Sequence, residues 1–146
     1  MIIFTPKRQS TLYLQNARAA PVFFRAGIRN ALYKIGLDSV RHASSLINNE
    51  GRTGRTYFIN GTPHVASGPG EAPANRTGKL KRSFNYLVRG VTELEWGNEI
   101  SYAASLEHGT KRMAPRQFLT PTHEKLQSQV VMDLEEEVDN AIKRRR

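Results

Sequence analysis

Hydrophobic residues recur every three or four positions over two long stretches of the chain, and this spacing predicts two amphipathic helices. The first helix is expected from Pro21 to Asn48, because a proline in a first helical turn has no N–H to lose. Its apolar stripe comprises Phe24, Ile28, Leu32, Ile35, Ser39, Ala43 and Leu46. The second helix opens at Thr120-Pro121, and its stripe comprises Leu126, Val130, Leu134, Val138 and Ala141 or Ile142.

The first predicted helix contains two glycines, Gly27 and Gly36. Each weakens a helix by about 1 kcal/mol relative to alanine, so we expect tertiary packing to hold this helix together. The run Asn48-Asn49-Glu50-Gly51 is expected to end it, since Asn and Gly tolerate the left-handed geometry of a C-cap.

Between the long helices the hydrophobic period shortens to two, which predicts strands. Residues 55–60 form one strand, Asn60-Gly61 is a hairpin-turn signal, and residues 62–65 begin the return strand. The alternation in residues 86–91 and 93–97 predicts an antiparallel pair of strands joined by a tight turn near Thr92. One face of this pair is expected to be covered. Trp96 alternates with Glu95 and Gly97, and we expect it in the core.

Two short helices complete the prediction. One is expected over residues 77–84, with Thr77 as N-cap and with Leu80 and Phe84 on one face. The other is expected from Tyr102 to His108, capped by Ser101 and ended by Gly109. Together the elements predict an α+β fold, in which a small antiparallel sheet is packed by a long N-terminal helix and a C-terminal helix.

Proline and glycine prevent regular secondary structure between Ser67 and Asn75. Gly68-Pro69-Gly70 and Ala72-Pro73 exclude a helix or a central strand there. We therefore expect an extended arm over residues 62–76.

A length of 146 residues suits one domain covering residues 1–146, with an N-terminal arm at 1–19 and a basic tail at 143–146.

The formal net charge is +9, which favours contact with polyanions such as nucleic acid or with an acidic partner. The chain has no cysteine, so disulfides and thiolate metal sites are excluded. It shows no signal peptide, and no apolar run approaches the ~18 residues of a membrane span. We expect a soluble protein without a membrane partner, made in a cytoplasm.

Catalytic patterns are missing from the sequence, and we expect no enzyme, no cofactor and no metal site. The four histidines (42, 64, 108 and 123) do not pair at metal-binding spacing. Thr77-Gly78-Lys79 resembles the end of a P-loop, but Pro73 and Leu80 occupy positions that require Gly and Ser or Thr.

Two blocks of sequence make the chain recognisable. The first has His64, then Ser-x-Pro-Gly-Glu-x-Pro-Ala from Ser67 to Ala74, then Thr-Gly-x-Leu-x-x-Ser from Thr77 to Ser83. The second has Tyr102-Ala103, then Leu-Glu-His-Gly-Thr over 106–110, then Met-Ala-Pro-Arg-Gln-Phe-Leu over 113–119. Together they span about a quarter of the chain.

In order and spacing these blocks resemble the small neck and minor tail (tail completion) proteins of long-tailed bacteriophages, the gene-product-ten-like neck family. The chain departs from the family at Gly68, where Ala is common, and at Gln117, where Pro is common. The resemblance implies the same architecture and a structural role without catalysis. It also implies a homo-oligomeric ring at the head–tail junction of a virion, assembled in the bacterial host cytoplasm with other neck, connector or tail proteins.

The resemblance also favours one of two interpretations of the arm. The arm is either a mobile surface loop or a proline-stiffened segment that docks on a neighbouring subunit, and the family favours docking. The arm residues are Ser67, Gly68, Pro69, Gly70, Glu71, Ala72, Pro73 and Ala74. The residues of the family motif are Thr77, Gly78, Leu80, Ser83, Tyr102, Glu107, Gly109, Thr110, Pro115 and Phe118, of which the last four are expected to position the turn into the last helix.

The basic run Arg76, Lys79, Lys81 and Arg82 is the candidate for charge contacts. It could touch DNA phosphates in a channel. It could instead keep the protein in solution or pair with the acidic residues 133–139 of a neighbouring subunit, which we favour. A free-standing, basic, non-specific DNA-binding protein is the alternative function.

Overall fold

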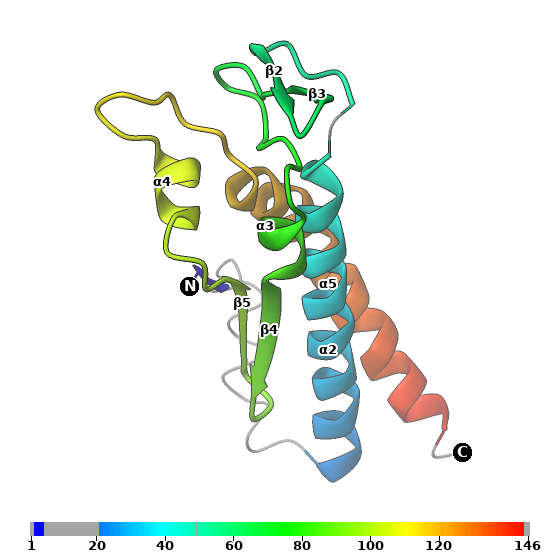
Figure 1. The fold of residues 1–146 in the computed structure, drawn as a ribbon. Coiled ribbons are helices and arrows are strands. Elements are labelled where there is room, and N and C mark those ends of the chain that lie inside the picture. Colours follow the sequence, from blue (N-terminus) through cyan, green and yellow to red (C-terminus); the bar gives the residue numbers. More distant parts are fainter. Residues whose placement is uncertain (1, 5–20, 49, 145–146) are drawn as a thin grey trace.

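The computed structural model describes residues 2–4, 21–48 and 50–144, and it confirms the predicted α+β class (Figure 1). The elements follow one another as β1 (Ile2–Phe4), α2 (Val22–Leu46), β2 (Thr56–Ile59), β3 (Thr62–Val65), α3 (Lys79–Arg82), β4 (Phe84–Arg89), β5 (Glu93–Asn98), α4 (Ala103–His108) and α5 (Leu119–Lys143). Two long helices and a slender sheet run side by side and give the molecule an elongated shape.

The main sheet is antiparallel, with strand order β1-β5-β4. Tyr86 lies opposite Trp96, and Val88 lies opposite Leu94, so these side chains share the face turned to α2. The predicted strand pair is confirmed, although β4 begins at Phe84, within the segment expected to be helical. Of the predicted N-terminal arm, residues 2–4 form strand β1 and residues 5–19 lie outside the described part of the chain.

Helix α2 is the middle layer, because it packs against the sheet on one side and against α5 on the other. It therefore buries Ala31, which lies outside the predicted stripe, in addition to Leu32 and Ile35, which belong to that stripe. The predicted stripe of α5 is confirmed by the burial of Leu126, Val130 and Leu134. These side chains, Trp96 and Phe118 belong to the hydrophobic core of the molecule.

The two glycines of α2 lie where its neighbours come closest. A Cβ at Gly36 would lie 2.4 Å from the ring of Tyr86, and a Cβ at Gly27 would lie 2.9 Å from the carbonyl oxygen of Glu137 on α5. Real Cβ atoms do not approach other atoms so closely. Gly27 and Gly36 therefore allow α2 to pack tightly on both sides, which offsets their low helix propensity.

Helix α2 ends at Leu46, two residues before the predicted end, and its C-terminus is capped differently from the prediction. The guanidinium of Arg52 donates to the carbonyl oxygens of Leu46 (2.8 Å) and Asn48 (3.0 Å). A cation at this position also interacts favourably with the negative end of the helix dipole. Gly51 has a positive φ, but it lies beyond the helix end and does not cap it.

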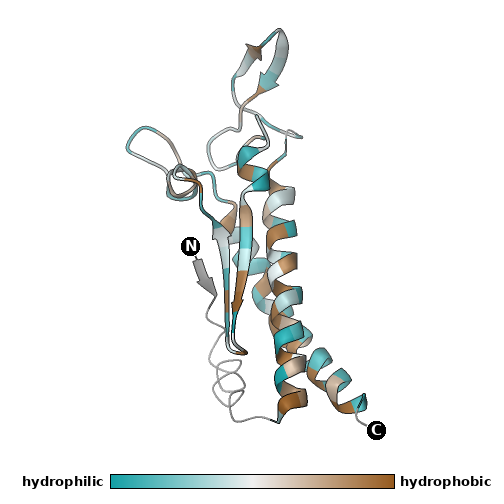
Figure 2. Ribbon diagram, turned by 60° about the horizontal axis from the view of Figure 1, so that its bottom comes forward, coloured by the Kyte–Doolittle hydropathy of each residue, from teal (hydrophilic) through white to brown (hydrophobic). Residues whose placement is uncertain are grey.

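Strands β2 and β3 form a separate two-stranded sheet, hereafter the hairpin (residues 56–65), instead of joining the main sheet. Asn60 and Gly61 at its tip both have positive φ, as the predicted tight turn requires. The hairpin stands beyond the C-terminal end of α2, away from the other layers (Figure 2). The predicted strand, turn and return strand are therefore confirmed, and they form a small antiparallel sheet of their own.

Both short helices begin later than predicted. Helix α3 is one turn long and its N-cap position is Gly78, while the hydroxyl of Thr77 accepts a bond from Lys79 N–H at 3.3 Å. Helix α4 begins at Ala103, and its N-cap is Tyr102, without a side-chain cap bond, in place of the predicted Ser101. Gly109 ends α4 with a positive φ, as expected.

In the predicted basic tail, Lys143 is the last residue of α5 and Arg144 is exposed, while residues 145–146 lie outside the described part of the chain.

Candidate assembly surface

A buried carboxylate from α4 caps the start of α5. The side chain of Glu107 is 1% exposed. It accepts hydrogen bonds from the backbone N–H groups of Phe118, Leu119 and Thr120 at 2.8–2.9 Å. The next residue is Pro121, which has no N–H, so the N-cap residue Phe118 and the first three residues of α5 leave no free backbone donor.

The Thr120 hydroxyl also donates to Glu107, at 2.6 Å. Burial alone would raise the pKa of Glu107, but the hydrogen bonds from Phe118, Thr120 and Leu119 outweigh burial and lower it. The carboxylate is therefore charged at neutral pH. It joins α4 to α5 across the intervening loop.

The loop between α4 and α5, residues 109–118, is closed by its own backbone. Thr110 and Met113 exchange N–H···O bonds of 2.8 and 3.2 Å. A Cβ at Gly109 would lie 2.7 Å from the Met113 carbonyl oxygen, so the loop leaves no space for a side chain there. Phe118 is fully buried and packs edge-on against Phe84 with ring centroids 5.7 Å apart. The structure thus places Gly109, Thr110 and Phe118 at the turn into the last helix.

Of the predicted arm (residues 62–76), residues 62–65 are strand β3 of the hairpin, whereas residues 67–75 pack on their own chain. The carboxylate of Glu71 accepts bonds from the hydroxyl of Thr53 (2.6 Å), from the Thr53 N–H and from the Gly68 N–H (2.8 Å). The side-chain bond from Thr53 and then the backbone bond from Gly68 lower the pKa of Glu71. A Cβ at Gly68 would lie 2.7 Å from the Thr53 hydroxyl oxygen, so glycine also permits this contact.

Further bonds join the arm to the 109–118 loop. The guanidinium of Arg116 donates to the hydroxyl of Ser67, which is 2% exposed, and the Gly70 N–H donates to the Pro115 carbonyl oxygen at 3.3 Å. Two segments far apart in sequence are thus bound together. These segments belong to the two blocks that carry the family resemblance.

The far end of the arm returns to α2. The N–H of Asn75 donates to the Asn48 carbonyl oxygen at 3.2 Å, and Arg52 reaches the Pro73 carbonyl oxygen at 3.4 Å. Pro73 is buried and Ala72 and Ala74 are partly buried, whereas Pro69 and Gly70 are exposed. Only the exposed tip of the arm is open to a neighbouring subunit in this arrangement, and docking there stays a prediction.

The four predicted charge-contact residues, Arg76, Lys79, Lys81 and Arg82, are all exposed at the end of the molecule that carries the hairpin. Arg82 donates to the Thr77 carbonyl oxygen at 3.0 Å. The side chains of Arg76, Lys79 and Lys81 make no hydrogen bond or ion pair with any described residue. They are available to an anionic partner.

The remaining motif residues of this region have structural contacts. Leu80 is buried in the core. The hydroxyl of Ser83 donates to the Leu80 carbonyl oxygen and accepts a bond from the amide of Asn98 at 2.7 Å, which fixes α3 to strand β5. Tyr102 is exposed, and its carbonyl oxygen accepts the Leu106 N–H.

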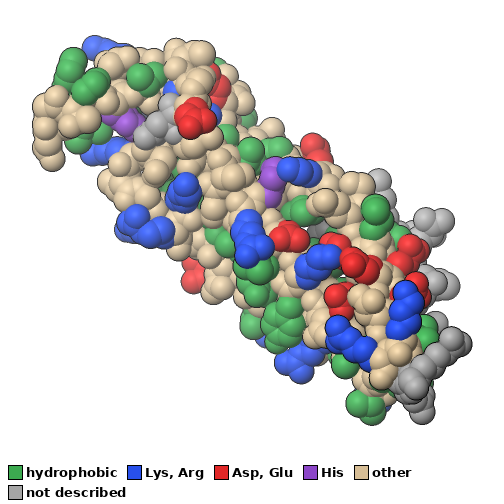
Figure 3. All heavy atoms as spheres, turned by 90° about the vertical axis from the view of Figure 1, so that its right-hand side faces the viewer, with side chains coloured by type: hydrophobic (Ala, Val, Ile, Leu, Met, Phe, Trp, Pro, Cys, Tyr) green, Lys and Arg blue, Asp and Glu red, His purple; other side chains and the backbone are tan. Residues whose placement is uncertain are grey.

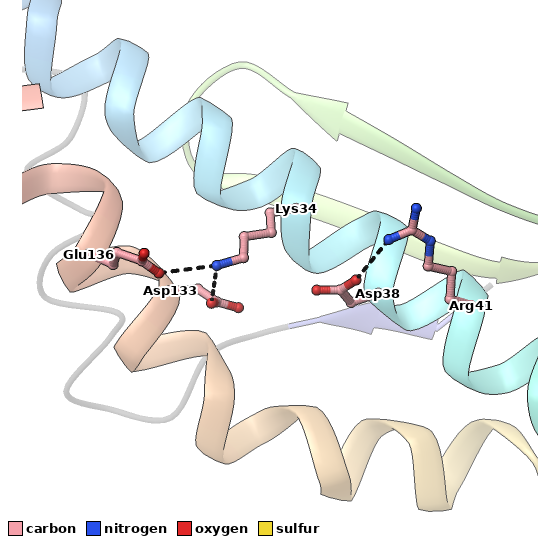
Figure 4. Close-up of polar contacts among 5 residues, drawn as sticks. All are labelled: Lys34, Asp38, Arg41, Asp133 and Glu136. Atoms are coloured by element: carbon pink, nitrogen blue, oxygen red, sulfur yellow. Dashed lines mark hydrogen bonds and ion pairs between the residues drawn. The ribbon is translucent and has the colours of Figure 1, made fainter. Parts of the chain in front are cut away.

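The acidic segment of α5 has a partner within the same chain. Lys34 of α2 lies between Asp133 (2.8 Å) and Glu136 (3.1 Å), as Figure 4 shows. Its hydrogen bonds to these carboxylates, Asp133 first, raise the pKa of Lys34. Glu135 and Asp139 remain exposed on the outer side of the helix.

The polar residues do not assemble into a metal-binding cluster anywhere in residues 2–4, 21–48 and 50–144. His42 of α2 contacts the Thr122 hydroxyl at 3.0 Å, and that hydroxyl donates to the Phe118 carbonyl oxygen. Burial, followed by the charge of Lys125, lowers the pKa of His42. These contacts join α2 to the start of α5, which is a structural role.

Over the same described ranges, none of the helices has the length and apolar character that crossing a lipid bilayer requires. The chain matches no family model, no curated protein and no solved structure. The resemblance to phage neck proteins therefore stays a prediction.

Sequence reasoning missed two polar residues of this surface. Arg52 and Arg116 were not singled out, although each joins separate segments through bonds to backbone or hydroxyl groups. Their partners are several to many positions away in sequence, so no local pattern could have identified them. The order of the two motif blocks was the one available signal that these segments meet.

Proposed function

We propose that the chain is a structural subunit of a tailed-phage or prophage virion. Identical copies would form a ring at the head–tail junction or at the top of the tail, and would act by assembly and not by catalysis. The role requires no cofactor. Neck, connector or tail proteins would be its other partners.

One observation carries the proposal. The two sequence blocks that resemble the neck and tail completion family meet in space, through Arg116 with Ser67 and Gly70 with Pro115. They form one bonded unit beside the projecting hairpin. A shared surface of this kind supports a common role for the two blocks.

The first test is the mass of the purified protein in solution, measured by light scattering at low and at moderate salt. We expect a discrete multiple of the 16.5 kDa chain that survives moderate salt, and a ring in negative-stain electron micrographs. A monomer at both salts that also fails to bind tail tubes or connectors from the encoding phage would contradict the proposal.

Non-specific DNA binding is the second candidate, supported by the exposed cluster Arg76, Lys79, Lys81 and Arg82. If all four side chains neutralise phosphates, log K should fall with log salt at a slope of about −3.6. Measurement of DNA affinity over a salt series decides this candidate. Replacement of Lys79 and Lys81 by Gln should reduce the slope by about 2 if they contact phosphate.

A further inference from the structure

Within residues 2–4, 21–48 and 50–144, no helix or further strand packs on either face of the hairpin, although Ile59, His64 and Val65 are partly buried. Phe58 is 74% exposed and lies opposite the exposed Pro63, while Tyr57 on the other face is also exposed and stacks near His64. A two-stranded hairpin is only marginally stable by itself in water. Figure 3 shows hydrophobic side chains gathered at this end of the molecule. An apolar hairpin presented in this way is suited to a protein partner.

The two ends of the hairpin are bonded to each other at its base, and the preceding residue Thr53 is bonded to the arm. Gly54 and Ala66 are joined by an N–H···O bond of 3.0 Å, the Ala66 N–H donates to the Arg55 carbonyl oxygen, and Glu71 holds Thr53. A Cβ at Gly54 would lie 2.5 Å from the Ala66 carbonyl oxygen, so the two chain segments are in close contact. A hairpin fixed at its base loses less conformational entropy when it binds a partner.

A second exposed apolar surface lies on the outer face of α5, from the middle of the helix to its C-terminal end. Val131, Met132 (68% exposed) and Ile142 are exposed hydrophobic residues there. Glu135 and Asp139 lie among them at helical spacing. Residues 128–142 contain five acidic residues and no Lys or Arg.

The charges of the two surfaces are opposite. Residues 50–82, which contain the hairpin, arm and α3, hold six cations and two acids. Among the cations, Arg55 is exposed at the start of the hairpin. A partner that covers the hairpin should therefore be apolar and acidic, and the outer face of α5 has both properties.

The two surfaces cannot meet within one copy of the chain. Gly27, near the start of α2, packs against Ala141 on α5, so the acidic end of α5 lies beside the beginning of α2. The hairpin stands beyond the other end of α2 (Figure 1). Contact between such surfaces must join different copies head to tail, and a repeated head-to-tail contact generates a ring or a filament.

We propose that the hairpin of one copy docks on the outer face of α5 of the next copy, with Phe58 against the Val131–Met132 surface and the basic side chains against Glu135 and Asp139. The inference rests on the proposed ring-forming function. It specifies which two surfaces make the repeating contact.

Cross-linking of engineered cysteines tests the contact without background, because the chain has no cysteine of its own. One variant carries Thr62→Cys at the hairpin, and another carries Ser128→Cys on the outer face of α5; both positions are exposed. A short bismaleimide should link the two variants when they are mixed. We expect a covalent dimer in the mixture and little in either variant alone.

A second measurement uses substitutions on each surface. Phe58→Ser and Met132→Glu should each raise the concentration needed for assembly by about tenfold or more, because each removes an exposed apolar contact at the centre of the interface. Leu87→Ser is the control, since Leu87 is also a large exposed apolar residue but lies on the outer side of the main sheet. Circular dichroism checks that all three variants fold.

The outcomes separate this inference from the proposed function. An assembly of unchanged mass in Phe58→Ser and Met132→Glu, without mixed cross-links, would overturn the docking contact and leave ring formation standing. A chain that never self-associates and never cross-links would overturn both. Selective loss of assembly in Phe58→Ser and Met132→Glu, together with mixed cross-links, supports the inference.

Discussion

The helical body and the hairpin end of this molecule are held together by different kinds of interaction. In the body, α2 lies between the sheet and α5, and apolar side chains such as Leu32 and Trp96 are almost completely buried. At the hairpin end, Arg52, Glu71 and Arg116 bind mainly backbone and hydroxyl groups of neighbouring segments. Apolar packing is distributed over many contacts, whereas each polar link is carried by one side chain. The body should therefore determine global stability, and the polar links should determine local order.

The largest effect is expected in the body. Trp96→Ala removes the largest fully buried side chain and should lower the free energy of unfolding by about 3–5 kcal/mol. Urea unfolding followed by circular dichroism measures this loss. Leu87→Ala, on the exposed side of strand β4, is the control and should change stability by less than about 1 kcal/mol. Similar losses in both variants would contradict the distinction between body and surface.

Glu107 joins α4 to the start of α5, and its substitution should have the next largest effect. Glu107→Gln removes the charge that three backbone N–H groups share, and should lower the free energy of unfolding by about 3 kcal/mol at neutral pH. Glu99→Gln, at an exposed carboxylate, is the matched control.

The Glu107 contribution should also depend on pH. The pKa of Glu107 is lowered in the folded chain, so as the pH falls the unfolded chain takes up this proton first, at a pH of about 4.3. The stabilisation should be complete above that pH and should disappear as pH falls through the folded-state pKa. The difference in the free energy of unfolding between wild type and Glu107→Gln should therefore become smaller in acid. A constant difference over this range would contradict the capping role.

A smaller and local effect is expected at Glu71. Glu71→Gln weakens the bonds to Thr53 and Gly68 and should speed amide hydrogen exchange at both residues while leaving the melting temperature nearly unchanged. Hydrogen exchange followed by NMR measures this effect, with Glu50→Gln as the control. Uniformly faster exchange throughout α2 and α5 would mean that the hairpin end and the body unfold together.

The smallest effect on stability is expected for the two ion pairs that Lys34 forms with Asp133 and Glu136. Lys34→Met removes its bonds to Asp133 and Glu136 and should reduce stability slightly at low salt, with no measurable change at high salt. Thermal unfolding at two salt concentrations measures the difference. A large loss that persists at high salt would show that these ion pairs contribute to the packing of α2 on α5.

The fold could be predicted because each long element carries its own periodic signal. The stripes of α2 and α5 and the alternation in β4 and β5 depend on residues close in sequence. The role of Gly36 could not be predicted in this way. Its absent side chain matters because Tyr86 lies against it, and that contact exists only after the sheet has packed on α2.

The candidate surface was predicted less completely. Proline and glycine in the arm correctly exclude regular structure, but they do not say what the segment contacts. Glu71 binds Thr53 eighteen residues away, and Glu107 binds Phe118 eleven residues away. Such bonds from a side chain to a distant backbone leave no periodic pattern, so the sequence indicated the residues without indicating their partners.

The hydrogen bond between Asn48 and Asn75 has a consequence for how this chain could be modified. The polypeptide leaves the end of α2 and returns to the same point before α3, so residues 50–74 form an excursion whose two ends meet. An excursion of this kind can be exchanged for another without changing the path of the chain through the rest of the molecule. The same α2–sheet–α5 framework could therefore present a different hairpin, and with it a different binding specificity, by replacement of residues 55–65 alone, which leaves the bonds of Arg52, Ser67 and Glu71 in place.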